Sequence, residues 1–170
     1  MQEIEQQNIF NHWIGQYQAL LFKVLRAYAF TVADREDLFQ EIAIQLWRSV
    51  PAFGKRSSET TWIYKVALNT ALNWTRKESK HQTGRESLPT REVILQPSDH
   101  VFDERLVWLY EQIALMNELD RSLCLLMLDG FSYKEMSHML GLSENNIGVK
   151  LHRIKKQLTA QAKNLAPHEL

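Results

Sequence analysis

The stretch from residue 131 to residue 158 constrains the fold most, because it has the sequence form of two short helices joined by a tight turn. Ser132 and Glu135 make a capping box, in which the serine oxygen accepts an N–H of the first turn and the glutamate reaches back. Gly141 stands where a left-handed residue ends a helix, and Ser143 is placed to cap the next one. The pattern predicts a helix-turn-helix.

Each of the two predicted helices has one apolar side. In the first helix this side is Tyr133, Met136 and Leu140, and in the second it is Ile147, Leu151, Ile154 and Leu158. Outer positions of the second helix hold side chains that can reach base edges and phosphates, namely Asn145, Asn146, Lys150, Arg153 and Lys156. Gly148 costs this helix about 1 kcal/mol relative to alanine, and we expect it to permit a close approach to the backbone.

The second helix is strongly basic, which fits a recognition helix in the major groove. Its basic residues are Lys150, Arg153, Lys155, Lys156 and Lys163, against the single acid Glu144. Asparagine suits adenine, whereas lysine and arginine suit guanine. The formal charge of the whole chain is zero, so we expect weak nonspecific binding to nucleic acid and a need for a partner.

Composition places the chain among ordinary globular proteins, since 45% of its 170 residues are hydrophobic. The only cysteine, Cys124, lies in an apolar run and is predicted to be buried. The six histidines are scattered without metal-ligand spacing, so we expect no metal and no cofactor. Neither a signal peptide nor a hydrophobic run of bilayer length is evident, and the expected location is the cytoplasm.

Helical periodicity runs through most of the chain and predicts an all-α fold. Before residue 80 it separates into residues 5 to 30, 34 to 50, a short piece near 60, and 61 to 79. It resumes from 103 to 119 and from about 120 to 128, before the helix-turn-helix. The expected organisation is two small helical domains, residues 1–80 and 104–164, joined by a flexible linker at 81–103 and followed by a tail at 165–170.

Residues 34 to 80 carry a second concentrated signal on two predicted helices. The inner face of the first is Leu38, Ile42, Ala43 and Leu46, and its outer face is Asp37, Gln40, Glu41, Ile44, Gln45 and Arg48. A mixed acidic and apolar outer face suits docking to another helix. The second helix buries Ile63, Val66, Ala67 and Ala71 or Trp74, and it lines up Lys65, Asn69, Asn73 and Arg76 on a face able to touch a nucleic-acid strand.

The loop before that second helix has the chemistry that holds single strands, which combines basic groups with stacking on aromatic rings. The residues concerned are Phe53, Lys55, Arg56, Trp62 and Tyr64. Trp62 and Tyr64 have an equally strong alternative, because aromatic side chains at helical spacing also belong to cores.

Three motifs in this order resemble those of the extracytoplasmic-function (ECF) sigma factors. DREDLFQEIAIQLW resembles DxEDLxQExFxxLW, and TTWIYKVALNTALNWTRK resembles TWLYRIARNxAxDxxRR. The stretch from Asn117 to Leu158 resembles LPxxxRxxFxLxxxEGLSYxEIAxxLGxSxGTVKSRLxRAR. Two departures are clear: Asp120 replaces the proline and is expected to cap its helix, and NIGVKL replaces TVKSRL.

The resemblance implies a sigma factor that binds core RNA polymerase and directs it to promoters. The N-terminal domain would dock on the polymerase clamp helices through Asp37, Gln40, Glu41, Ile44 and Arg48. It would melt and read the −10 element with Lys55, Arg56, Trp62, Tyr64, Lys65, Asn69, Asn73 and Arg76, flipping a base into the loop of residues 53–60. The C-terminal domain would contact the −35 element through Ser143, Asn145, Asn146, Lys150, Arg153 and Lys156.

The same resemblance implies three partners and no enzymatic activity. The partners are core polymerase, through its clamp helices and flap, promoter DNA, and an anti-sigma factor. Because polymerase carries the catalytic chemistry, we expect no catalytic residues, no small-molecule substrate and no membrane insertion. A monomer is expected, since a dimer would need a further self-complementary surface.

Three alternatives stay open at this level. A helix-turn-helix regulator that binds duplex DNA without polymerase would carry an upstream domain with strands, against the helical pattern here. A helical-bundle enzyme could use Glu41 and a histidine, although the sequence shows no local arrangement for proton transfer. An adaptor or anti-sigma-type protein would not need a basic recognition helix.

Overall fold

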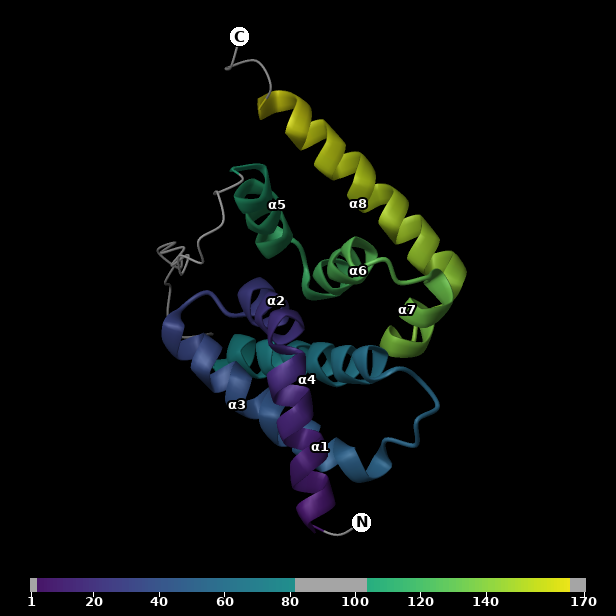
Figure 1. Ribbon diagram of the computed structural model, residues 1–170. Coiled ribbons are helices and arrows are strands. Elements are labelled where there is room, and N and C mark those ends of the chain that lie inside the picture. The colour runs from purple at the N-terminus through teal and green to yellow at the C-terminus, as the bar shows by residue number, and fades with distance from the viewer. Residues whose placement is uncertain (1–2, 82–103, 166–170) are drawn as a thin grey trace. The chain divides into compact units, whose positions relative to one another are not determined.

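The computed structural model describes residues 3–81 and 104–165, and every regular element in these ranges is a helix (Figure 1). The chain divides into two compact units, Met1–Val101 and Phe102–Leu170. The all-α prediction is confirmed. The predicted linker falls almost entirely outside the described residues, and the domain boundaries drawn around it stay predictions.

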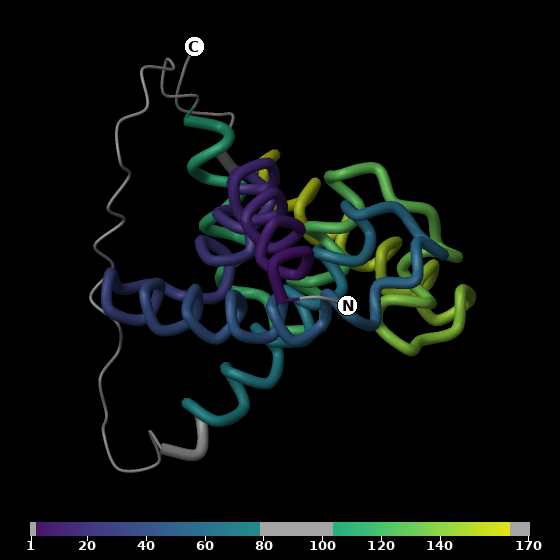
Figure 2. The backbone as a smooth tube through the Cα atoms, turned by 60° about the horizontal axis from the view of Figure 1, so that its bottom comes forward, coloured from purple at the N-terminus to yellow at the C-terminus, as the bar shows by residue number. Residues whose placement is uncertain are grey.

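The first unit contains four α-helices and one 3-10 turn. They are α1 (Glu3–Gln16), α2 (Gln18–Tyr28), α3 (Val32–Ser49), η1 (Val50–Ala52) and α4 (Glu59–His81). The chain between η1 and α4 runs as an irregular loop at one end of the bundle (Figures 1 and 2). The short piece expected near residue 60 is the start of α4.

The prediction of one helix over residues 5 to 30 is wrong, because the chain breaks at Tyr17 between α1 and α2. Tyr17 has φ −107° and ψ 24°, outside helical geometry. Its hydroxyl donates a hydrogen bond to Glu59 Oε2 at 3.1 Å. The break thus coincides with a contact to the first residue of α4, 42 positions away in sequence, which a local apolar pattern does not reveal.

The core of the first unit lies where α3 and α2 pack on α4. The predicted inner face of α3 is confirmed at Leu38, Ile42 and Leu46, all fully buried, whereas Ala43 is half-buried. The core residues of α4 are Ile63, Tyr64, Ala67, Leu68 and Ala71. Burying such apolar side chains contributes about 1.5–3 kcal/mol each for the larger ones, so this layer fixes which faces of α3 and α4 point outward.

Glu59 joins the α1–α2 junction to α4. Besides Tyr17, the fully buried Trp13 donates its indole N–H to Glu59 Oε1 at 3.1 Å, and His12 Nε2 lies 3.4 Å from Oε2. Burial raises the pKa of the Glu59 carboxyl, but the hydrogen bonds from Trp13 and Tyr17 and the attraction of His12 outweigh it, so the pKa is lowered. The ionised carboxylate is therefore the form that holds the junction.

The second unit contains α5 (Glu104–Leu115), α6 (Glu118–Leu128), α7 (Tyr133–Leu140) and α8 (Glu144–Leu165). Cys124 is buried as predicted, and burial raises the pKa of its thiol to about 11. The expectation that Asp120 caps α6 is wrong. Asn117 is the cap, its side chain accepts the Asp120 N–H at 2.9 Å, and Asp120 lies inside the first turn.

Arg121 joins α6 to the end of α5. It is only 7% exposed and its guanidinium donates to the carbonyl oxygens of Ile113, Ala114 and Met116 at 3.3, 2.9 and 2.9 Å. The last carbonyls of a helix have no partner within the helix, so a cation beside them can donate the missing hydrogen bonds. Its charge also interacts favourably with the negative end of the helix dipole. Arg121 therefore holds the end of α5 against α6.

The helix-turn-helix forms as predicted. Ser132 and Glu135 make a complete capping box, Gly141 is left-handed with φ 70°, and Ser143 Oγ accepts the Asn146 N–H at 3.2 Å. The hydrogen bond from the Ser132 backbone lowers the pKa of Glu135, with the Ser132 hydroxyl adding to it. One detail is wrong: Tyr133 is 42% exposed, and Met139 joins Met136 in the core instead.

Changing Glu59 to alanine should destabilise the first unit by about 1–3 kcal/mol, because the buried Trp13 N–H loses its acceptor. Urea unfolding followed by tryptophan fluorescence measures this, since four of the five tryptophans precede residue 80. Because the folded pKa lies below the ordinary 4.5, the difference from the natural protein should be present above pH 4.5 and shrink as the pH falls through the folded pKa. Glu36→Ala, at an exposed position of α3, is the matched control and should be neutral.

Changing Arg121 to alanine should destabilise the second unit by about 2–4 kcal/mol, because the end of α5 loses three charge-assisted hydrogen bonds. Arg121→Lys should recover only part of the loss, since an ammonium lacks the guanidinium fork. Thermal unfolding by circular dichroism measures both variants. Equal stability of the alanine variant and the natural protein would show that Arg121 does not stabilise the contact between α5 and α6.

Candidate nucleic-acid interfaces

The orientation of α8 is set by its buried stripe. Ile147 and Leu151 are fully buried and Ile154 is 3% exposed, while Leu158 is half-buried. With 100° per residue, the side of α8 opposite this stripe carries Asn145, Arg153 and Lys156. All three are exposed, so three of the residues predicted to contact DNA share one outward face.

Lys150 is less available than the sequence predicted. It lies on the flank of α8, its side chain is 26% exposed, and its Nζ lies 3.4 Å from Asp120 Oδ1 of α6. A partly buried ion pair holds this lysine against the neighbouring helix. Asn146 is exposed on the same flank, and the Ser143 hydroxyl is engaged in capping. A DNA contact stays a prediction for all six residues of this site.

Two outward residues of α8 were not predicted from the sequence. Val149 is 52% exposed and lies opposite the buried stripe, and His152 is also exposed. Helical arithmetic from Ile147 would have placed both outward. A valine and a histidine lack the charged and amide groups that mark a DNA contact in a sequence.

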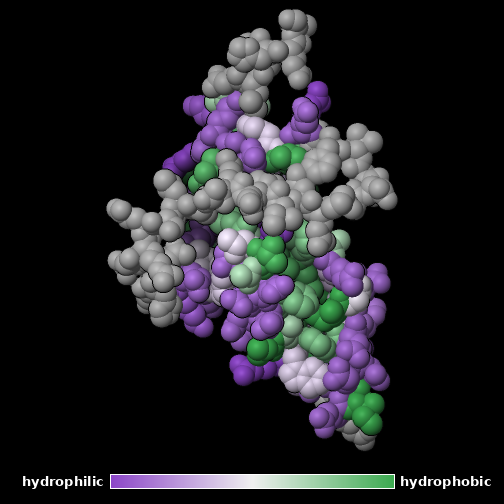
Figure 3. Space-filling view, turned by 90° about the vertical axis from the view of Figure 1, so that its left-hand side faces the viewer, coloured by the Kyte–Doolittle hydropathy of each residue, from purple (hydrophilic) through white to green (hydrophobic). Residues whose placement is uncertain are grey.

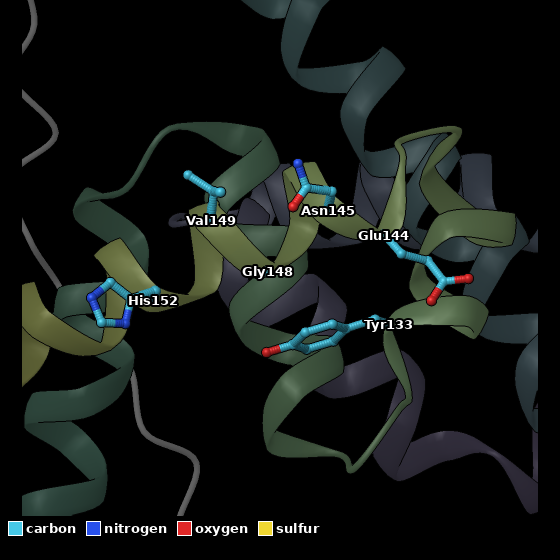
Figure 4. A pocket seen from close by; sticks show the side chains of 6 residues that line it. All are labelled: Tyr133, Glu144, Asn145, Gly148, Val149 and His152. Atoms are coloured by element: carbon cyan, nitrogen blue, oxygen red, sulfur yellow. The ribbon is translucent and has the colours of Figure 1, made fainter.

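Val149 and His152 border a shallow hollow between α7 and α8 (Figure 4). We call it the Tyr133 hollow, and its lining is Tyr133, Glu144, Asn145, Gly148, Val149 and His152. The Tyr133 ring from α7 lies along α8 at Gly148, with Asn145 and Val149 on the other side of that glycine. A Cβ at Gly148 would lie 3.4 Å from Tyr133 Cε2, an ordinary van der Waals distance, so the close approach to the backbone expected at Gly148 stays a prediction.

In the first unit, one groove between α3 and α4 brings together four of the five residues predicted to bind polymerase and four of the eight predicted to contact the −10 element. From α3 it is lined by Asp37, Gln40, Glu41, Ile44, Gln45 and Ser49, and from α4 by Trp62, Lys65, Val66, Asn69, Thr70, Asn73, Trp74, Lys77 and Glu78. The α3 wall is acidic and apolar, whereas the α4 wall carries lysines and amides. Arg48 and Arg76 are exposed but do not line this groove.

Aromatic residues near the loop are packed against one another. Phe53 lies 5.3 Å from Trp13 and 5.6 Å from Trp62 between ring centroids, and the Trp62 N–H donates to Ser49 Oγ at 3.1 Å. Trp62 is half-buried. The prediction of Tyr64 as a DNA contact is wrong, because Tyr64 is only 1% exposed and belongs to the core.

The basic residues of this loop stay accessible. Lys55 and Arg56 are both exposed, and Lys55 has φ 54°, the only positive φ at a non-glycine residue in the described chain. Such a conformation costs of order 1 kcal/mol and is often found at functional loops. The loop therefore presents two cations beside a packed aromatic cluster.

No group of three or more metal-binding side chains occurs among the described residues. Within residues 3–81 and 104–165, no helix is both long enough and apolar enough to span a bilayer.

Comparison with known families matches both units. The Sigma-70 region 2 model matches residues 13–81, and the Sigma-70, region 4 model matches residues 106–158. The ECF RNA polymerase sigma factor SigX of Bacillus subtilis is 30% identical over 134 residues, covering 72% of this chain and 68% of SigX. The ECF RNA polymerase sigma-E factor of Haemophilus influenzae is 24% identical over 161 residues, covering 88% and 85%.

Solved structures show the same fold. The sigma factor RpoE of Bartonella quintana, in complex with the anti-sigma factor NepR, has a TM-score of 0.70 at 18% identity and covers 89% of this chain and 98% of RpoE. CnrH, in complex with the cytosolic domain of CnrY, has a TM-score of 0.64 at 16% identity and covers 93% and 90%. The two Sigma-70 region matches and the identity to SigX are those of a transcription initiation factor. The chain belongs to the ECF RNA polymerase sigma factors.

Proposed function

We propose that this sigma factor uses three surfaces: the outer face of α3 for core RNA polymerase, the loop and outer face of α4 for the −10 element, and the outward face of α8 for the −35 element. The observation that carries the proposal is the outward face of α8. Burial of the opposite stripe leaves amide and cationic side chains pointing away from the protein, where a major groove can receive them.

The proposed polymerase surface is Asp37, Gln40, Glu41, Ile44 and Arg48 of α3. Four of these residues are exposed and Glu41 is half-buried. Ile44 is 45% exposed, an apolar anchor ringed by charged and amide groups. Such a centre with a polar rim is typical of helix-docking interfaces, which supports binding to the polymerase clamp helices.

The proposed −10 surface is Lys55, Arg56, Lys65, Asn69, Asn73 and Arg76, with Trp62 at its edge. All but the half-buried Asn69 and Trp62 are exposed. Cations can follow the backbone of a separated strand, and amides can hydrogen-bond unpaired bases. The loop of residues 53–60 would receive a flipped base, whose extrusion costs a few kcal/mol that these contacts must offset.

The proposed regulator is an anti-sigma factor, because RpoE was solved in complex with the anti-sigma factor NepR and CnrH in complex with the cytosolic domain of CnrY. Apolar side chains remain at the surface among polar ones, as one face of the molecule shows (Figure 3). Among the described residues of the first unit, the large ones are Ile4, Phe22, Phe30, Val32, Phe39 and Ile44. Covering Ile44 would compete directly with polymerase.

The proposed factor carries out no reaction of its own and acts in the cytoplasm, where polymerase meets the chromosome. Polymerase supplies the catalytic chemistry of RNA synthesis. The −35 contact fixes the position of the complex, and the −10 contact opens the duplex.

Changing Ile44 to aspartate should weaken the complex with core polymerase at least tenfold, because it puts a charge at the centre of the proposed interface. The dissociation constant for core polymerase, measured by fluorescence anisotropy of labelled sigma factor, reports this. Val32→Asp is the matched control: it is 49% exposed and starts α3, where a negative charge is favoured. Unchanged affinity of the Ile44 variant would contradict the α3 assignment.

Changing Arg153 to alanine should weaken promoter binding by the holoenzyme and reduce the slope of log affinity against log salt by about one. Lys150→Ala should have a smaller effect, because Asp120 already neutralises that lysine. Salt titrations of promoter binding with both variants measure the difference. A larger loss for Lys150 than for Arg153 would contradict the orientation of α8 toward DNA.

A further inference from the structure

We propose that the Tyr133 hollow receives the C5-methyl group of a thymine in the −35 element, making Tyr133, Gly148 and Val149 specificity-determining residues. The inference rests on the proposed function, in which α8 enters the major groove. It extends that function from electrostatic contact with a duplex to recognition of one base.

The first observation is that apolar surface is exposed on the outward face of α8, whose other residues are polar or basic. Val149 is 52% exposed at the centre of the outward face of α8, and Tyr133 is 42% exposed on the adjoining end of α7. Both line the same hollow (Figure 4). An apolar group of matching size is the occupant that this lining favours.

The second observation is that packing does not require glycine at position 148. Its φ is not positive, and a Cβ would meet Tyr133 Cε2 at 3.4 Å, an ordinary van der Waals distance. Alanine would make the helix more stable by up to about 1 kcal/mol. Gly148 lines the hollow, so a methyl group at this position would lie against the Tyr133 ring and narrow the hollow there.

The occupant follows from where the hollow lies. Thymine is the base that presents an apolar group, its C5-methyl, in the major groove, and short apolar side chains are its usual partners. The basic residues of α8 attract a duplex to this face, and Asn145 beside the hollow can hydrogen-bond a neighbouring adenine. A phosphate is disfavoured, because Glu144 lines the hollow and no lysine or arginine does.

The consequence is a sequence preference. The −35 element should contain a thymine on the α7 side of α8, and the contact should depend on the methyl group alone. Deoxyuridine has the same hydrogen-bonding edge as thymidine and lacks only that methyl group, so it isolates the contact.

The test uses the full chain bound to core polymerase and a promoter identified by mapping its transcription start. Each thymine of the −35 element is replaced in turn by deoxyuridine, and promoter affinity is measured by competition. At one position, binding should weaken about fourfold, the loss expected for one methyl group left unburied. In Val149→Ala and in Gly148→Ala holoenzymes this ratio should fall toward one.

Two controls separate the methyl contact from other effects. Gln157→Ala changes an exposed residue of α8 outside the hollow and should keep the fourfold ratio. Thermal unfolding should show Gly148→Ala to be at least as stable as the natural protein, so a lost ratio there cannot come from misfolding.

The inference is overturned if no thymine responds to loss of its methyl group, if the −35 element contains no thymine, or if the ratio stays near four in both variants. An unrelated protein partner in the hollow would give the first of these results. Failure of the holoenzyme to bind unmodified promoter DNA would overturn the proposed function as well, which distinguishes the two.

Discussion

The rotation of α8 about its own axis is the constraint on which the account of DNA recognition depends. Ile147, Leu151 and Ile154 are buried, and exposing any one of them would cost about 1.5–3 kcal/mol. A helix held in this way has one possible outward face. The capping box at Ser132 and the left-handed Gly141 set where α7 begins and ends, and so where α8 can start. In the proposed assignment, these buried and capping residues thus determine which side chains of α8 face DNA.

A similar division organises the first unit. The buried faces of α3 and α4 pack together, which leaves one groove with an acidic and apolar wall and a basic, amide-rich wall. In the proposed assignment, polymerase binds beside the strand that the factor must open. A contact on one wall can then stabilise the groove that the other wall uses. In the same assignment, the packing of α3 on α4 would place core binding and promoter opening on the two walls of one groove.

Local signals were enough to predict the helix-turn-helix, its caps and its buried stripe, because each depends on residues within a few positions of one another. Two failures are local, namely the cap of α6 and the exposed Tyr133, and the others involve partners far apart in the sequence. The break at Tyr17 depends on Glu59, and Lys150 is held by Asp120, 30 positions away. Tyr64 and Trp62 both have aromatic rings on which a base could stack. The packing of α4 buries Tyr64 and half-buries Trp62. Sequence spacing cannot tell an aromatic core residue from an aromatic contact when both sit at a helix start.

The most direct measurement mixes the purified chain with core RNA polymerase and maps transcription starts on genomic fragments. The account predicts a stable complex and discrete start sites whose aligned upstream sequences share −35 and −10 elements. Specific binding of duplex DNA by the free chain, without any complex with polymerase, would contradict it.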